Sequence, residues 1–281
     1  MNNEDLIKIV TTNIINYVLN DHKICKYFNG HYKSQKYTLD QLLPIIIFVL
    51  KQNISWRSVS ELKICGDIHW NTVYKMHIKL VKYKVYENTY EHILNKFYNK
   101  QKNANNLKVQ MTDTTNIFNK YGIDKIGYNR SCPKHNISKL SIISDFNGVP
   151  INVKLSSGNT NDAKIFNKQL NSNNLVDITL ENKNKSLMLA DKAYDSSILR
   201  QKMLEKKYKR LIAPMNKRNI KNPKLIRKMS KRDKNIFKHR SVIERKINTI
   251  KRYKRLNTRY DKHSSSYMGF VYLACIMEIF K

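Results

Sequence analysis

The basic stretch from Lys234 to Tyr260 contains one acidic side chain in an unusual position. Ten residues of this stretch are lysine or arginine, whereas the only carboxylate is Glu244. If the stretch is helical, Arg240, Glu244 and Lys251 fall within an arc of roughly 40° and share one narrow face. A cationic face of this kind is suited to bind polyanions. The acid within it therefore needs a separate explanation, such as a bound cation.

Two other carboxylates break the pattern of the segments that contain them. Apolar and polar residues alternate over 107–112, which is typical of a half-buried strand and places Asp113 on the apolar face. The continuous apolar run 186–190 predicts a buried strand, and Asp191 follows it directly. Carboxylates just past the ends of buried strands are candidate ligand-binding groups. An isoleucine stripe beside Glu244 would dock its helix on such a sheet, so the three acids could converge.

Convergent carboxylates repel one another and are commonly neutralised by hard divalent cations. Mg²⁺ prefers oxygen ligands and binds through one or two carboxylates together with waters and substrate phosphates. Two such ions, roughly 3.5–4 Å apart, activate the attacking oxygen and stabilise the leaving oxygen in phosphoryl displacement. Asp113, Asp191 and Glu244 are therefore candidate ligands for two Mg²⁺ or Mn²⁺ ions, with the surrounding cations holding a phosphate backbone.

The whole chain carries a large excess of positive charge. Its 281 residues include 53 Lys and Arg against 21 Asp and Glu, a formal net charge of +32. An AT-rich coding sequence would enrich lysine and asparagine, but it would enrich glutamate equally, and acids are scarce. The charge therefore indicates a nucleic-acid partner, with an anionic membrane surface as the lesser alternative.

Neither a targeting sequence nor a membrane segment is evident. The longest apolar run, residues 42–50, is far shorter than the ~20 residues of a spanning helix. The four cysteines show no CxxC spacing and predict no disulfide framework. We expect an intracellular, DNA-associated protein with no membrane partner, located in the cytoplasm or nucleoid, or in the nucleus of a eukaryotic host.

The periodicity of the sequence changes near residue 105. Apolar residues recur with a helical period through residues 1–105, and the polar stretch 99–106 ends this pattern. We predict a small all-α domain here. Two of its helices could form a helix-turn-helix that places residues 71–82 in a DNA groove, or could belong to a plain bundle. Residues 106–281 predict an α/β domain, in the order strand, strand, strand, helix, strand, helix, strand, helix, helix.

Four segments resemble the DDE transposases of bacterial-type insertion sequences, which have an RNase H-like catalytic domain. They are QMTDTTNI around Asp113, ISDFNGVPINVKLSSGNTNDAKIF, LADKAYDS around Asp191, and HRSVIERKINTIKRYKRLNTRYDK around Glu244. The likeness covers most of the chain, and the predicted order of elements agrees with an RNase H-like mixed sheet with flanking helices. The N-terminal segments SWRSVSE and HWNTVYK are similar to that family's DNA-binding region.

The resemblance implies a metal-dependent DNA transposase that cleaves transposon ends and transfers the strands, the cut-and-paste mode. It implies that Asp113, Asp191 and Glu244 bind two Mg²⁺ or Mn²⁺ ions and that a homodimer binds terminal inverted repeats and target DNA. It also implies that Arg240 and Lys251 contact DNA near the cleavage site. The neighbouring cations are further expected DNA contacts: Arg245, Arg252, Lys254 and Arg255.

Two other functions share these features. An inactive or domesticated DNA-binding protein derived from a transposase would keep the fold without turnover, and a stand-alone DDE nuclease would cleave without strand transfer. Phe237 replaces the tyrosine of the Tyr-Arg-Glu-Lys signature, and Ala193 stands where glycine is common. The connector 216–233 is too short for the large β-strand insertion of some relatives.

Some of the acids have alternative, structural interpretations. Asp195 competes with Asp191, but its position before a predicted helix is typical of an N-cap. Glu244 could merely pair with Arg240 four residues earlier, a surface contact worth about 0.2–0.5 kcal/mol. The remaining acids of this kind lie at predicted turns or at a helix start, where aspartate is common: Asp124, Asp145 and Asp162.

Overall fold

The computed structural model describes residues 2–28, 36–61, 66–130, 136–171, 186–206, 208–217 and 228–281. The chain forms two compact units. Unit 1 comprises Met1–Ile93, Phe118–Asp124 and Ile250–Lys281, and unit 2 comprises Leu94–Ile117 and Lys125–Thr249. These units do not follow the predicted boundary at residue 105, because the C-terminal segment groups with the N-terminal helices.

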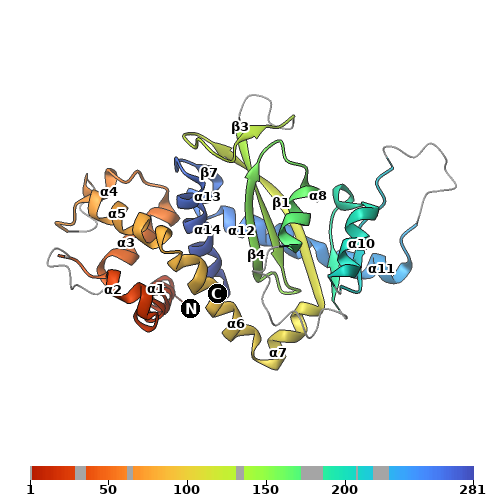
Figure 1. Cartoon of the computed structure of the whole chain (residues 1–281), viewed down its shortest axis with the longest axis horizontal. Helices are drawn as coiled ribbons and strands as arrows, with labels where there is room; N and C mark the ends of the chain where they lie inside the picture. Colours follow the sequence, from red (N-terminus) through yellow and green to blue (C-terminus); the bar gives the residue numbers. More distant parts are fainter. Residues whose placement is uncertain are drawn as a thin grey trace. The chain divides into compact units, whose positions relative to one another are not determined.

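Unit 1 is mainly helical (Figure 1). Residues 71–82, which could either enter a DNA groove or belong to a plain bundle, form a helix as predicted. A short strand, β7, pairs in parallel with the last two residues of β1 (Val109–Asn119). The elements of unit 1 are α1 (Asn3–Asn20), α2 (His22–Phe28), α3 (Leu39–Gln52), α4 (Ser58–Glu61), α5 (Trp70–Lys82), α6 (Val85–Tyr98, which continues into unit 2), α13 (Lys254–Asn257), β7 (Thr258–Arg259) and α14 (Ser264–Ile279).

The C-terminal helix α14 belongs to the core of unit 1, where it packs against α1, α3, α5 and α13. Apolar side chains occur on all sides of this helix, and nearly all of them are buried. A helix that is apolar all round is stable only when neighbours cover every side. The N-terminal helices provide this cover, which explains the grouping of the chain ends. None of the described helices, α14 included, combines the length and apolar content that a membrane crossing requires.

His77 of α5 is fully buried in this helical core. Its ring stacks on Phe270 with centroids 4.2 Å apart, its Nδ1 lies 3.2 Å from the Tyr86 hydroxyl and its Nε2 lies 3.1 Å from the Ser266 hydroxyl. Burial lowers the pKa of His77 to about 4, although the nearby Asp261 carboxylate opposes this shift. The folded protein therefore keeps the ring neutral at neutral pH.

Acidification should therefore destabilise the protein through His77. In the unfolded chain the ring takes up a proton near its ordinary pKa of about 6.5, whereas in the folded chain it does so only near pH 4. The stabilisation is complete above pH 6.5 and is lost as the pH falls towards 4, by about 3 kcal/mol in total. Urea unfolding across this range should show that His77→Gln lacks this part of the pH dependence. Parallel pH profiles of the two proteins would contradict a neutral, buried His77.

Unit 2 has the predicted α/β composition. The stretch from Lys234 to Tyr260, expected as one helix, is divided among several elements in the two units, and residues 218–227 of the connector lie outside the described residues. The elements of unit 2 are α7 (Gln101–Ala104), η1 (Asn105–Lys108), β1, β2 (Gly127–Tyr128), β3 (Asn136–Ser144), β4 (Pro150–Ser157), α8 (Asp162–Leu170), β5 (Leu187–Leu189), η3 (Lys192–Tyr194), α10 (Ser197–Glu205), β6 (Arg210–Ile212), α11 (Lys231–Phe237), η5 (Lys238–Arg240) and α12 (Ser241–Lys251, which ends in unit 1).

The strands form a mixed sheet in the order β2-β3-β1-β5-β6, with β4 paired to β3. β5 is parallel to β1 and β6 is parallel to β5, whereas β3 and β4 form an antiparallel hairpin. A hairpin on one side of the first strand and parallel strands on its other side form an RNase H-like sheet. The predicted fold class, an α/β domain of this type preceded by helices, is confirmed.

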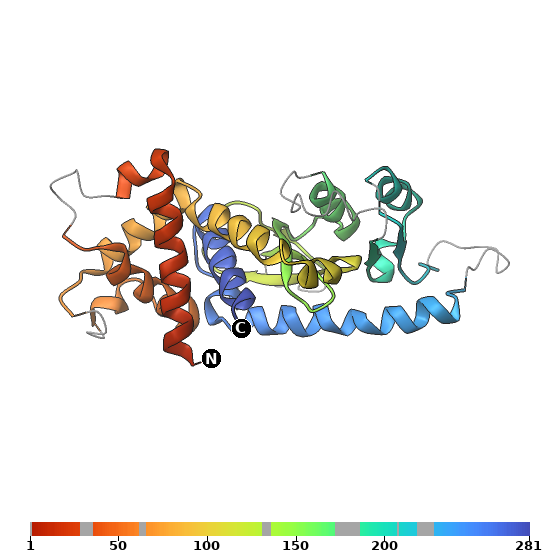
Figure 2. The ribbon, with the colours of Figure 1, turned by 90° about the horizontal axis from the view of Figure 1, so that it is seen from below.

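Helices cover both faces of the sheet, as Figure 2 shows for α12 on one face and α8 and α10 on the other. Gln110 and Thr112 of β1 are buried, although the alternation placed them on the polar face. Gln110 is satisfied there, because its amide donates to the Leu107 carbonyl and its oxygen accepts from the Tyr208 hydroxyl. The alternation of apolar and polar residues identified the strand, but it did not indicate that helices cover the second face of the sheet as well.

The turn between β3 and β4 lies where the sequence predicted it, at Asn147 and Gly148. Gly148 has a φ of +84°, a conformation that glycine adopts without steric penalty. Asp145 is buried just before the turn and accepts hydrogen bonds from the backbone N–H groups of Asn147 and Val149 and from the Tyr98 hydroxyl. Asp145 therefore stabilises the turn and is a structural acid, as expected.

Candidate active site

Asp113 lies in the middle of β1 and is half-buried. Its Oδ1 accepts a hydrogen bond from the Thr114 N–H at 2.9 Å. Burial raises the pKa of the Asp113 carboxyl above its ordinary value, although the Arg240 guanidinium and the Thr114 N–H act in the opposite direction. The negative charges of Asp191 and Glu244 raise this pKa further, so both acids lie near enough to interact with Asp113.

Asp191 follows the buried strand β5, as the sequence predicted. β5 pairs in parallel with β1, and Leu189 is the register partner of Met111. Asp113 lies two residues after Met111, and Asp191 lies two residues after Leu189. The parallel strands therefore direct both carboxylates to the same region of the sheet. Asp191 also begins the turn η3, where its Oδ1 accepts from the Lys192 N–H at 2.6 Å.

Tyr194 connects this turn to β1, a contact that was not predicted. Its hydroxyl lies 3.2 Å from Oγ1 of Thr114, the residue after Asp113. The ring is buried and packs edge-on against Phe166 of α8 at 5.7 Å. Tyr194 thereby fixes the turn that begins at Asp191 against the strand that carries Asp113. The only sequence signal was its place in the LADKAYDS segment.

Arg240 joins two of the predicted acids. Its Nη1 lies 2.6 Å from Oε1 of Glu244, and its Nη2 lies 3.0 Å from Oδ2 of Asp113. The contact with Glu244 shows that the two residues share one face of the segment, as predicted. This contact is also the local ion pair that the alternative interpretation of Glu244 predicted. The second contact, to Asp113 on β1, is more than a local helical pair.

The three carboxylates do not converge as closely as expected. In the part of the chain that the structure describes, no three acidic, imidazole or thiol side chains are gathered closely enough to hold a metal ion. Arg240 lies between Asp113 and Glu244, and the carboxylate of Asp191 accepts from its own turn. The acids occupy one region of unit 2, but a guanidinium separates two of them.

The chemistry of this site nevertheless fits a divalent metal. Asp113 and Glu244 already bind the guanidinium of Arg240 between them, so a positive charge stands where a metal ion would bind. The acidic ligands available are carboxylate oxygens, the donors that Mg²⁺ and Mn²⁺ prefer. Asp191 interacts electrostatically with Asp113 and can complete the set. Asp113, Asp191 and Glu244 therefore remain the candidate ligands for a metal ion at this site.

Most of the other predicted cations lie on the surface. Arg245 on α12, Arg252 and Lys254 are exposed, and Lys251 is the last residue of α12. Arg255 is the exception, and its prediction as a DNA contact is wrong. It is 4% exposed, pairs with Asp261 in unit 1, and packs against aromatic rings. Its charge is used inside the fold and is unavailable to phosphate.

The acids for which the sequence suggested structural roles pair with other groups of the chain. Asp195 accepts from the guanidinium of Arg200 at 2.7 Å and from the Asn216 N–H at 3.0 Å. The N-cap of α10 is Ser196, so the predicted capping role of Asp195 is wrong, although its structural role is clear. The other two acids also form ion pairs: Asp124 with Arg259 and Asp162 with Lys139.

The departures from the family pattern are located in well-defined elements. Ala193 is exposed within η3 and is not among the described residues with a positive φ, so glycine is not required there. Phe237 is the last residue of α11 and is half-buried. Its missing hydroxyl removes one hydrogen-bonding group just before Arg240.

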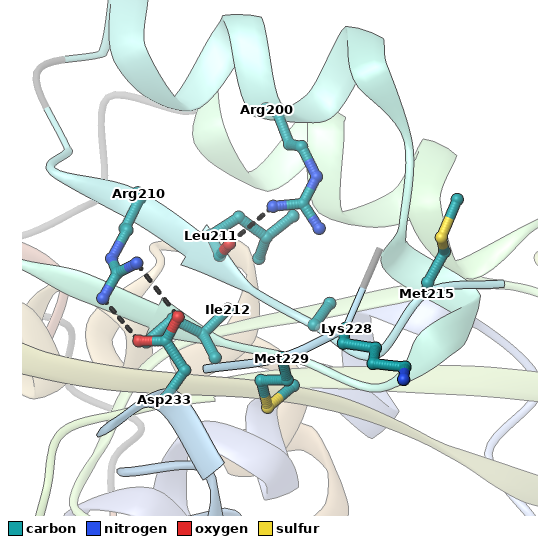
Figure 3. Close-up of a pocket in the computed structure, with 9 residues that line it drawn as sticks. Arg200, Arg210, Leu211, Ile212, Met215, Lys228, Met229 and Asp233 are labelled. Carbon is teal, nitrogen blue, oxygen red and sulfur yellow. Dashed lines mark hydrogen bonds and ion pairs between the residues drawn. The ribbon is translucent and has the colours of Figure 1, made fainter. Parts of the chain in front are cut away.

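A separate cavity of about 260 Å³ lies beside β6 (Figure 3). Arg210 forms a two-pronged ion pair with Asp233 of α11, and Arg200 donates to the Leu211 carbonyl at 2.7 Å. Both arginines at the cavity are thus committed to partners within the chain, and none of the three predicted carboxylates lines it. The Arg210 pair anchors α11, the helix that precedes Arg240.

The RNase H-like sheet, with acids on β1, after β5 and on α12, defines a DDE-type domain. Residues 96–278, more than half of the chain, match the family described as the transposase DDE domain. The chain belongs to this family. A candidate transposase of insertion sequence element IS6501 from Brucella ovis is 28% identical over 140 residues, which cover 50% of this chain and 95% of the relative.

Solved structures with some similarity are complexes of the Mos1 transposase. A pre-cleavage Mos1 transpososome aligns with 92% of this chain and 99% of its own chain, at 11% identity and a TM-score of 0.28. A mariner Mos1 paired end complex with Mg aligns with 91% and 97%, at 12% identity and the same TM-score of 0.28. These scores are low, and the fold assignment rests on the strand order of the sheet.

Proposed function

We propose that the chain is a metal-dependent DNA transposase that cleaves transposon ends and transfers the strands by cut-and-paste transposition. The observation that carries this proposal is the cation held between Asp113 and Glu244, together with the electrostatic interaction of Asp113 with Asp191. A cation-binding acidic site within a transposase DDE domain is the arrangement that this chemistry requires.

Within this proposal, the chain's own residues bind and orient the reactants. Asp113, Asp191 and Glu244 would hold two Mg²⁺ or Mn²⁺ ions, which activate the attacking oxygen and neutralise the leaving oxygen when bound. Asp191 is oriented by its turn, which Tyr194 fixes against β1. Glu244 is oriented by α12, whose isoleucine stripe is buried.

The proposed partner is double-stranded DNA, both at the terminal inverted repeats and at the target. The exposed cations Arg245, Arg252 and Lys254, together with Lys251, lie along or just after α12 in the sequence and are suited to bind the phosphate backbone. We further propose that the N-terminal helices bind the transposon ends and that the chain acts as a homodimer on DNA. The net charge of +32 supports a DNA partner.

A cleavage assay distinguishes this function from its alternatives. The substrate is a supercoiled plasmid that carries a marker between two copies of the element's terminal repeat, with Mg²⁺ and a second plasmid as target. A transposase should release the marker and join its 3′ ends to the target. Release without joining would indicate a stand-alone nuclease, and binding without cleavage would indicate an inactive DNA-binding descendant.

A further inference from the structure

Arg240 is the cation that the structure places between two of the proposed metal ligands. Its guanidinium lies 3.0 Å from Asp113 and 2.6 Å from Glu244. The side chain is only 15% exposed, so its contact with Asp113, itself 19% exposed, is partly shielded from water, whereas Glu244 is 52% exposed. Pairing with Glu244 is expected of any i, i+4 pair on a helix. Pairing with Asp113 is not, because that residue lies 127 positions earlier on a strand.

The remaining nitrogen of this guanidinium is unsatisfied. Nε of Arg240 is buried and has no hydrogen-bond partner within the described ranges of the chain. A guanidinium presents its donors in a planar fork that matches phosphate as well as carboxylate. Arg240 therefore has a buried donor without a partner in this arrangement of the described residues, and the donor could reach an anion outside the chain only if the side chain moved.

A divalent cation and this guanidinium exclude one another. A metal ion held by Asp113 and Glu244 needs the same carboxylate oxygens, and two cations at such short range repel each other. Metal binding therefore requires that Arg240 release at least one carboxylate. A released guanidinium with little exposure to water needs another anionic partner.

We propose that Arg240 couples metal binding to DNA binding by exchanging its carboxylate partners for a phosphate of the bound DNA. This inference rests on the proposed function, which supplies both the metal and the phosphate. In the free chain the guanidinium neutralises Asp113 and Glu244 and lowers their affinity for metal. On DNA it turns to the phosphate and frees both carboxylates. Because such coupling is reciprocal, metal strengthens DNA binding by the same factor.

The test measures Mn²⁺ binding to the full chain from the electron paramagnetic resonance signal of the free ion. Titrations are made with and without a duplex that carries the element's terminal repeat. In the wild type, the duplex should tighten Mn²⁺ binding about tenfold, within the usual range for coupled sites. Without DNA, Arg240→Gln should bind Mn²⁺ about tenfold more tightly than the wild type, and the duplex should then change its affinity by less than about twofold.

Arg245→Gln is the matched control, because it removes an equal charge from an exposed arginine beside Glu244. Without DNA it should keep the wild-type Mn²⁺ affinity within about twofold. If Mn²⁺ affinity without DNA rises equally in both variants, or does not rise in Arg240→Gln, the proposed exchange of partners is wrong. If neither Arg240→Gln nor the DNA-bound wild type binds Mn²⁺ at a site that Asp113→Asn removes, the proposed function itself fails. Thermal unfolding of each variant verifies that it is folded.

Discussion

Asp113→Asn is expected to abolish Mg²⁺-dependent cleavage of a duplex that carries the terminal repeat, lowering the rate by about 10³-fold or more. Asparagine keeps the shape of the side chain but replaces a charged oxygen ligand with a neutral amide, which a hard cation binds weakly. Asp191→Asn and Glu244→Gln should give the same loss. DNA affinity, measured by fluorescence anisotropy at fixed salt and without divalent ions, should not fall in any of them, because removing an acid does not weaken phosphate binding.

Asp162→Asn is the control that separates the loss of a metal ligand from the loss of a charge. Asp162 lies in the same unit, at the start of α8, and pairs with Lys139 of β3 at 2.8 Å. This variant should cleave at the wild-type rate. Equal losses in Asp162→Asn and Asp113→Asn would show that folding, rather than metal binding, is affected.

The same substitution at Asp113 should leave the metal-free protein about as stable as the wild type at neutral pH. Burial raises the pKa of Asp113 despite Arg240, so the folded chain holds this proton more strongly than the unfolded chain. The charge therefore lowers stability once the pH rises above the ordinary aspartate pKa. Asparagine removes this penalty but deprives Arg240 of a partner, and urea unfolding should show a net change within about 1 kcal/mol. A loss of about 3–5 kcal/mol would indicate a structural ion pair.

Features that depend on neighbouring residues could be predicted from the sequence. Alternation located β1, the Asn147-Gly148 pair located the hairpin turn, and the apolar run before Asp191 located β5. The stripe of Ile243, Ile247 and Ile250 is buried, as its helical spacing indicated. In each case the signal is local, because strand alternation, turn chemistry and helical periodicity act over a few residues.

Features that depend on distant parts of the chain could not be predicted in this way. The sequence gives no sign that Arg240 reaches Asp113, because that contact exists only after β1 and η5 have come together in the fold. Arg255 likewise lies in a basic stretch and was therefore predicted to contact DNA, yet Asp261 and aromatic rings of unit 1 enclose it. A cationic stretch can therefore contain buried structural arginines as well as exposed cations, and the sequence pattern alone does not distinguish them.

Arg259 is the clearest of these buried arginines. Its side chain is fully buried, and its guanidinium donates to the Asp261 carbonyl at 3.0 Å, to the Asp124 carbonyl at 2.7 Å and to the Lys262 carbonyl at 3.1 Å. It also pairs with the Asp124 carboxylate. Gly122 packs against the guanidinium, and a Cβ atom there would lie 2.6 Å from its central carbon. The arginine thus donates to three backbone carbonyls and one carboxylate from a single buried position.

Arg259→Ala should therefore destabilise the protein by about 3–5 kcal/mol, because it removes several hydrogen bonds of a fully buried guanidinium and leaves a cavity in the place of a large side chain. Urea unfolding followed by far-UV circular dichroism measures this change. Arg259→Lys keeps the charge but lacks the planar fork, so it should recover only part of the loss. Arg252→Ala, which removes an exposed arginine seven residues earlier, should change stability by no more than about 0.5 kcal/mol. Similar small effects at both positions would contradict a structural role for Arg259 in the core of unit 1.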